Sequence, residues 1–120
     1  MRILIGEDDK AIAEVVTIIL QNEGHAVIHA VDEKTLRSYL SQKPELILLD
    51  VGLGGADGGE IAKNLKKNAT YRKIPLIIIS ANSDTKKIAK DSGADGFLLK
   101  PFDMDDLLSL VTSHSPKPLS

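Results

Sequence analysis

Five short apolar runs recur along the 120-residue chain at nearly regular spacing, and each has the length of a β-strand. The runs are rich in Ile, Leu and Val and cover residues 3–5, 26–31, 46–49, 76–79 and 97–99. Continuous apolar runs are typical of strands buried on both faces, as in parallel sheets, although a buried helix gives the same pattern. The segments between the runs therefore decide the fold class.

These intervening segments have the period of helices. In the first of them the apolar residues fall at i, i+3, i+4, i+7 and i+8, and a glycine follows at a position typical of a helix end: Ile12, Val15, Val16, Ile19, Leu20, then Gly24. Shorter apolar groups mark helices around residues 36–40, 61–65, 88–89 and 107–111. Strands that alternate with helices need right-handed crossovers, which place helices on both faces of a parallel sheet. The pattern predicts a doubly wound α/β domain of five strand–helix pairs.

Length and composition agree with one globular domain. Charged residues make up 27% of the chain and hydrophobic residues 42%, which is ordinary for a folded domain of this size. Residues 113–120 carry two prolines and no apolar period. We therefore expect a domain over residues 1–112, followed at 113–120 by a flexible tail or the start of a linker.

Charge and residue usage argue against several classes of protein. Fifteen Lys and Arg against 17 Asp and Glu leave a net charge of −2, so direct binding to nucleic acid or to anionic lipid is not expected. The chain has no cysteine, which excludes disulfides and thiolate metal sites. No apolar run approaches the roughly 18 residues of a membrane span, and the first predicted strand leaves no room for a signal peptide. We expect a cytoplasmic protein that does not enter the membrane.

Polar residues follow the predicted strands, where the ligand crevice of an open α/β sheet lies. The first strand leads into Glu7, Asp8 and Asp9, the third into Asp50, the fourth into Ser80 and the fifth into Lys100. Asp9 immediately precedes a predicted helix, where an N-cap role is the simpler interpretation. Five of the eight residues from 52 to 59 are glycine, so the loop after the third strand permits close approach of a ligand.

Several carboxylates at one sheet edge repel each other, and a divalent cation relieves that repulsion. Oxygen ligands without His or Cys favour Mg²⁺ or Mn²⁺, and Mg²⁺ commonly shares its coordination shell with a phosphate. Lys100 and Ser80 offer a positive charge and a hydroxyl that suit phosphate oxygens. Asp50 follows a buried strand, and a carboxylate can attack phosphorus to give an aspartyl phosphate. Asp50 is therefore the candidate nucleophile.

These residues lie in segments that resemble a known family. The acidic residues after the first strand, "LILLDVGLGGADGGEI" around Asp50, "IPLIIISA" and "GADGFLLKPF" are similar to the response-regulator receiver domain of two-component signalling. The resemblance extends from residue 2 to about residue 112, and the hydroxyl of Ser80 comes 30 residues after Asp50. It implies a flavodoxin-like (βα)5 sandwich with the parallel strand order 2-1-3-4-5.

The resemblance also implies a role for each site residue. By this resemblance, Glu7 and Asp8 would bind the metal ion together with the phosphoacceptor Asp50 and the backbone carbonyl of Gly52. Ser80 would supply the switch hydroxyl, Phe97 the switch aromatic ring and Lys100 the ammonium group that pairs with the phosphate. Relatives carry a cis peptide bond between this lysine and the next proline, and we expect one at Lys100–Pro101.

By the same resemblance, a histidine kinase or a histidine phosphotransfer protein would supply the phosphoryl group to Asp50. Phosphorylation would then shift the face made by the fourth helix, the fifth strand and the fifth helix, which an output protein or effector domain reads and through which two copies could pair. No separate enzyme activity is expected beyond Mg²⁺-dependent self-phosphorylation from phosphodonors and autodephosphorylation.

The chain departs from the family pattern in the loop after Asp50. Relatives often carry a proline four residues after the acceptor and a larger side chain two residues after it, where this chain has Gly54 and Gly52. We therefore expect this loop to be looser than in relatives. The small residue at position 52 and Asn82 both flank the path by which relatives admit the phosphate, so they affect the expected lifetime of the phosphoryl group.

Rival functions fit the residues less well. Toprim-like nucleotidyl sites and haloacid-dehalogenase-type phosphatases need paired aspartates that Asp50-Val51-Gly52 does not offer, and a nucleotide-binding domain needs a glycine-rich turn where Glu7 and Asp8 stand. The remaining alternative is a phosphorylation-independent pseudo-receiver that acts as a protein-binding module.

Overall fold

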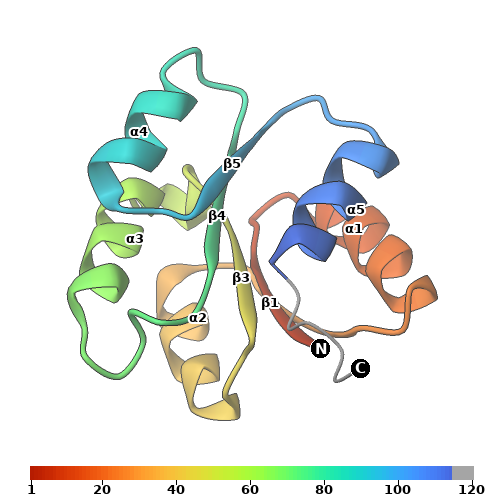
Figure 1. Cartoon of the computed structure of the whole chain (residues 1–120), viewed down its shortest axis with the longest axis horizontal. Coiled ribbons are helices and arrows are strands. Elements are labelled where there is room, and N and C mark those ends of the chain that lie inside the picture. Colours follow the sequence, from red (N-terminus) through yellow and green to blue (C-terminus); the bar gives the residue numbers. More distant parts are fainter. Residues whose placement is uncertain (115–120) are drawn as a thin grey trace.

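The computed structural model describes residues 1–114, in which strands and helices alternate along the chain (Figure 1). The strands are β1 (Arg2–Gly6), β2 (Ala26–Ala30), β3 (Leu46–Asp50), β4 (Leu76–Ser80) and β5 (Gly96–Leu99). The α-helices are α1 (Lys10–Asn22), α2 (Glu33–Tyr39), α3 (Gly58–Lys67), α4 (Thr85–Ser92) and α5 (Met104–Ser113). Short 3₁₀ turns, η1 (Leu40–Gln42) and η2 (Leu53–Gly55), follow α2 and β3.

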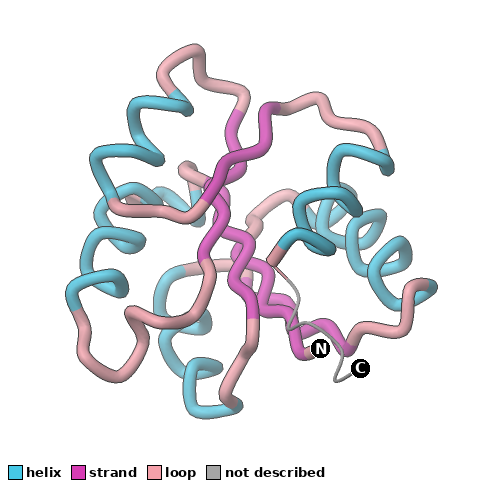
Figure 2. Tube along the Cα trace, viewed as in Figure 1, coloured by secondary structure: helices cyan, strands magenta, loops and turns pink. Residues whose placement is uncertain are grey.

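All five strands are parallel and form one sheet in the order β2-β1-β3-β4-β5, as the resemblance implies (Figure 2). The register pairs Gly6 of β1 with Leu49 of β3, and Asp50 with Ile79 of β4. The carboxyl ends of these neighbouring strands therefore lie level at one edge of the sheet. This alignment brings together residues that are distant in the sequence.

Each strand alternates its side chains between two hydrophobic cores, because successive residues of a strand point to opposite faces. One core joins the sheet to α1 and α5 and includes Ile5, Leu48 and Val16. The other joins the sheet to α2, α3 and α4 and includes Leu49 and Ile61. Figure 1 shows α1 and α5 on one side of the sheet and the three remaining helices on the other. Residues of β3 and β4 are buried throughout, since these strands are covered on both faces.

An aspartate occupies the N-cap position of all five α-helices, and four of these aspartates form side-chain cap hydrogen bonds. The side chains of Asp9, Asp32, Asp57 and Asp103 accept hydrogen bonds from backbone N–H groups in the first turns of α1, α2, α3 and α5. Such N-caps contribute about 1 kcal/mol each and determine where the helix begins. The N-cap role of Asp9 is thus confirmed.

The sequence pattern is wrong in some details. The apolar stripe of α1 is not buried along its whole width: Val16 and Leu20 are buried, whereas the side chain of Val15 is 56% exposed. The second strand ends at Ala30, one residue before the predicted end, and Val31 is partly exposed. Helix α5 continues to Ser113, and the rest of the predicted tail, residues 115–120, lies outside the described residues.

Candidate phosphoacceptor and metal site

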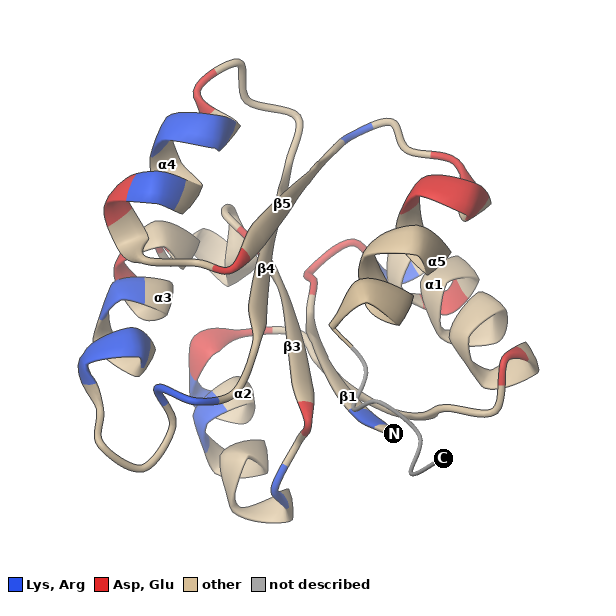
Figure 3. Ribbon diagram, viewed as in Figure 1, with Lys and Arg blue, Asp and Glu red and all other residues tan. Residues whose placement is uncertain are grey.

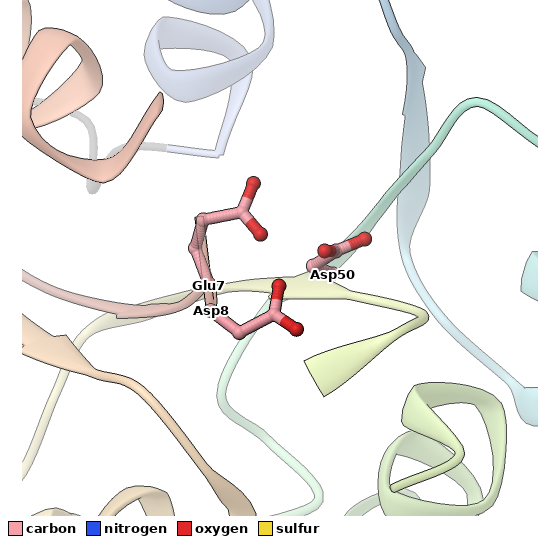
Figure 4. A group of neighbouring side chains, drawn as sticks. All are labelled: Glu7, Asp8 and Asp50. Carbon is pink, nitrogen blue, oxygen red and sulfur yellow. The ribbon is translucent and has the colours of Figure 1, made fainter. Parts of the chain in front are cut away.

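Three carboxylates meet at the carboxyl edge of the sheet. Glu7 and Asp8 follow β1 directly, and Asp50 is the last residue of β3. One carboxylate oxygen from each lies within 4.8 Å of the other two, and Figure 4 shows the three side chains around a common space. The parallel pairing of β1 with β3 brings these three acids together.

The three acids differ in exposure. Glu7 is 3% exposed and Asp50 is 9% exposed, whereas Asp8 faces solvent. The chain also packs closely just before the acidic pair, at Gly6. A Cβ added to Gly6 would lie 2.9 Å from Leu49 Cδ1, so a glycine at this position lets the end of β1 pack tightly on β3.

Lys100 extends from the end of β5 into the same site. Its ammonium nitrogen Nζ lies 2.7 Å from Glu7 Oε1 and 3.4 Å from Asp50 Oδ2. The following peptide bond, Lys100–Pro101, is cis, which confirms the prediction. The lysine thus partly neutralises two buried carboxylates that come from different strands.

Burial and neighbouring charges shift the titration of two of these groups. Burial raises the pKa of Glu7 from 4.5 to about 7, and the nearby Asp50 carboxylate adds to the rise while Lys100 opposes it. Burial alone would lower the pKa of Lys100, but the carboxylates of Glu7 and Asp50 outweigh it and the pKa is raised. The site therefore carries more negative charge than one lysine can compensate.

The residues present suit a hard divalent cation. Among residues 1–114, the buried oxygen Oε2 of Glu7 makes no hydrogen bond, so a ligand atom of this carboxylate is left for another partner. The other candidate side-chain ligands, Asp8 and Asp50, also offer carboxylate oxygens, which Mg²⁺ prefers. Gly52 is exposed beside them, and its N–H lies 3.4 Å from Asp50 Oδ1. The resemblance assigns the backbone carbonyl of Gly52 to the metal ion, and this role stays a prediction.

Ser80 and Phe97 lie on the two strands that continue the sheet beyond β3. Ser80 ends β4 and is 5% exposed, and its Oγ accepts a hydrogen bond of 2.9 Å from the N–H of Asn82. Phe97 pairs with Ile78 in the sheet, and its half-buried ring packs against the core beneath α2, α3 and α4. The hydroxyl and the ring thus lie on adjacent strands, one at the site and the other toward α4.

An apolar groove opens next to the site. It has a volume of about 470 Å³ and runs between α1 and the segment after β5, where Ile12, Val15, Lys100 and Phe102 line it. The exposure of Val15, which the helical pattern did not predict, is part of this groove. Lys100 links the groove to the carboxylates.

One contact of the site was missed in the sequence. The ring nitrogen Nε2 of His29 in β2 lies 2.7 Å from the main-chain carbonyl oxygen of Glu7, a contact that no motif in the sequence indicates. The signal that was available is its position: His29 comes one residue before the end of β2, which pairs with β1 immediately before the acidic pair.

The strand order and the helices on both faces define a flavodoxin-like α/β domain, and its carboxyl edge carries the acidic cluster. Residues 3–112 match the sequence profile of the response regulator receiver domain. The chain belongs to this family of two-component signalling proteins, as its motifs indicate.

Similar proteins of known sequence are response regulators. The chain is 39% identical over 113 residues to the response regulator ArlR of Staphylococcus saprophyticus, covering 92% of this chain and 50% of that protein. It is 36% identical over 113 residues to the DNA-binding dual master transcriptional regulator RpaA of Synechocystis sp., covering 92% and 47%. The chain thus spans about half the length of the curated relatives it matches. The expectation that this chain does not bind nucleic acid directly stays a prediction.

Solved structures agree with this assignment. The chemotaxis response regulator CheY4 of Vibrio cholerae superposes with a TM-score of 0.86 at 25% identity, covering 95% of this chain and 98% of that one. A receiver domain of a signal transduction histidine kinase from Syntrophus aciditrophicus gives 0.86 at 29% identity, covering 99% and 96%. In residues 1–114, no helix combines the length and hydropathy that a membrane span requires.

Proposed function

We propose that this chain is a phosphorylation-dependent receiver in which Asp50 accepts a phosphoryl group from a histidine kinase or a histidine phosphotransfer protein. The observation that carries the proposal is the convergence of Glu7, Asp8 and Lys100 on Asp50 at the carboxyl edge of the sheet. Receiver domains as a family interact with histidine kinases and with output domains.

Asp50 is the nucleophile. One of its carboxylate oxygens attacks phosphorus, the bond between phosphorus and the donor nitrogen breaks, and the donor imidazole leaves. The hydrogen bonds that Asp50 accepts from Lys100 and from the N–H of Gly52 are both 3.4 Å long. Such long contacts leave the carboxylate largely free to react.

Charge neutralisation is divided between Lys100 and a bound cation. Glu7, Asp8 and Asp50 would hold Mg²⁺ or Mn²⁺, together with the carbonyl of Gly52. When bound, the cation neutralises negative charge on the transferring phosphoryl group. Lys100 already reaches Asp50, with Nζ at 3.4 Å from Oδ2, and its ammonium group can pair with a phosphate oxygen formed there.

The new phosphate changes the position of Ser80. It adds about 1.5 to 2 negative charges and three acceptor oxygens next to the end of β4. The Ser80 hydroxyl now accepts from Asn82 and is free to donate its own proton to a phosphate oxygen. Inward movement of Ser80 makes room for the Phe97 ring, which shifts the α4–β5–α5 face between two states.

The surfaces around the site fit two kinds of partner. The apolar groove between α1 and the segment after β5 lies beside Lys100, where a helix of the phosphodonor can dock. The α4–β5–α5 face carries opposite charges, with exposed lysines on α4 and aspartates at the start of α5 (Figure 3). An output protein, an effector domain or a second copy of the chain would read this face.

Intact-protein mass spectrometry after incubation with acetyl phosphate tests the proposal. The wild type should gain the mass of one phosphoryl group when Mg²⁺ is present and not when EDTA replaces it. Asp50→Asn should gain nothing, whereas the control Asp105→Asn, at an exposed position in α5, should behave as the wild type.

The absence of an adduct would favour a pseudo-receiver that binds partners without phosphorylation, unless the phosphoryl group is too short-lived to detect. Titration with beryllofluoride in the presence of Mg²⁺ separates these two outcomes. A pseudo-receiver gives no saturable change in its amide NMR spectrum, whereas a short-lived receiver does.

A further inference from the structure

The ring of His29 holds the main chain of the acidic pair. Its Nε2 lies 2.7 Å from the carbonyl oxygen of Glu7, and the two residues are 22 positions apart in the sequence. A carbonyl oxygen can only accept, so Nε2 carries the proton and donates. The contact is therefore a directed hydrogen bond from an edge strand to a residue of the site.

Strand β2 binds both polar groups of the Glu7 main chain. The N–H of Glu7 donates to the carbonyl oxygen of Ala30 at 3.0 Å, and the Glu7 carbonyl accepts from His29. The parallel ladder itself ends at the pair Gly6 and Ala30. Beyond that pair, the ring of His29 replaces a ladder bond that β2 no longer supplies.

The position of this bond matters because the Glu7 carbonyl belongs to the peptide group that joins Glu7 to Asp8. The orientation of that peptide determines the direction in which Asp8 leaves the strand. Asp8 is itself exposed, and its contact with the N–H of Gly54 is long, at 3.3 Å. The side chain of Asp8 thus depends on its backbone for its placement.

We propose that His29 is a positioning residue for the metal site, in that its N–H fixes the peptide between Glu7 and Asp8 and so preorganises both carboxylates for a divalent cation. This inference rests on the proposed function, which assigns these carboxylates to the cation. Outer contacts that orient ligands are a general determinant of metal affinity.

Packing alone is the competing explanation. His29 also lines a groove of about 430 Å³ between α1 and β2, together with apolar residues such as Ile18 and Val31. A ring that only filled this groove could be replaced by an apolar side chain. If the ring instead positions the peptide, a side chain that replaces it must carry an N–H donor that reaches the Glu7 carbonyl.

Two substitutions at this position separate the explanations. His29→Leu removes the donor and keeps the bulk, whereas His29→Gln keeps an N–H donor on a side chain of similar length. His29→Met is a second apolar variant in case the leucine variant does not fold. His25→Leu removes a half-buried histidine just before the other end of β2 and serves as the matched control.

The measurement is the dissociation constant of Mg²⁺ by isothermal titration calorimetry, with thermal unfolding in EDTA as the check on stability. We expect His29→Leu to weaken Mg²⁺ binding by about threefold to tenfold, somewhat below the effect of losing the partner of a ligating side chain. His29→Gln should restore affinity to within about twofold of the wild type. His25→Leu should bind as the wild type.

Each other outcome overturns the inference. If His29→Leu and His29→Met bind Mg²⁺ as tightly as the wild type, His29 does not position the site. If His29→Gln loses as much affinity as His29→Leu, the ring acts through packing. If the wild type itself binds no Mg²⁺, the cation assigned by the proposed function is wrong and the inference fails with it, a result distinguishable from the other two.

Discussion

Lys100 lies closer to Glu7 than to Asp50: its Nζ is 2.7 Å from Glu7 Oε1 and 3.4 Å from Asp50 Oδ2. The lysine therefore neutralises the buried residue of the acidic pair while leaving the proposed phosphoacceptor with a long contact. This arrangement makes the charge balance of the site, and hence its stability, depend on three residues from three different strand ends.

Lys100→Met should destabilise the domain in EDTA at pH 8. Breaking an ion pair by removing one partner leaves an uncompensated charge, and for this partly exposed lysine we expect a loss of about 1–2 kcal/mol in the free energy of unfolding. Urea denaturation measures it. At this pH the double variant Glu7→Gln/Lys100→Met should be more stable than the sum of the two single effects predicts, because Glu7→Gln then also removes the carboxylate that Lys100→Met leaves unpaired; strictly additive effects would contradict the pairing.

Glu7 should make the cation-free domain less stable as the pH rises. Its pKa is raised from 4.5 to about 7 in the folded protein, so the folded state binds more protons than the unfolded state between these values. The contribution of Glu7 to stability is therefore complete below about pH 4.5 and is lost as the pH rises through about 7.

Glu7→Gln tests this expectation. In EDTA the variant should be more stable than the wild type at pH 8, by about 1–2 kcal/mol, and the difference should disappear near pH 4.5. Thermal or urea unfolding at a series of pH values measures the difference, which isolates Glu7 from the other titrating groups. A difference that does not change with pH would argue against a raised pKa for Glu7.

Ser80→Ala should separate phosphorylation from its structural response. The variant keeps Asp50 and the acidic pair, so it should still gain a phosphoryl group from acetyl phosphate. It lacks the hydroxyl that would move toward the phosphate, so amide NMR shifts in α4 and β5 on beryllofluoride addition should shrink severalfold. Shifts equal to those of the wild type would remove Ser80 from the switch.

Gly58→Ala should destabilise the domain, although alanine favours helices. A Cβ at Gly58 would clash with the carbonyl oxygen of Asp50 and would lie 2.7 Å from Val51 Cα, because α3 starts directly against the end of β3. We expect a net loss of about 1–3 kcal/mol by urea denaturation, which exceeds the gain in helix propensity of about 1 kcal/mol.

Gly52→Ala is the matched control for that substitution. A Cβ at Gly52 would meet no described atom within 4 Å, and its φ of −93° suits any residue. Its free energy of unfolding should change by no more than about 0.5 kcal/mol. Equal losses at the two glycines would mean that loop entropy, and not the close approach of α3 to β3, decides the effect.

The sequence by itself was sufficient for the fold class, the five strand–helix pairs and the acidic residues at the strand ends. Strand and helix periods are local properties, and parallel strands must present their carboxyl ends at one edge. The family resemblance added the strand order and the cis bond before Pro101, both of which the structure shows, and the roles proposed for the site residues. None of these steps required a distance between side chains.

Only the tertiary structure decided which atoms meet at that edge. Three features depend on contacts between strands: the preference of Lys100 for Glu7, the Glu7 oxygen that has no hydrogen-bond partner within residues 1–114, and the bond from His29 to the Glu7 carbonyl. The exposure of Val15 depends in the same way on how α1 is rotated over the sheet. Such contacts are set by strand register, helix orientation and side-chain rotamers together. The sequence pattern, by contrast, indicates only which face of its helix or strand a residue occupies.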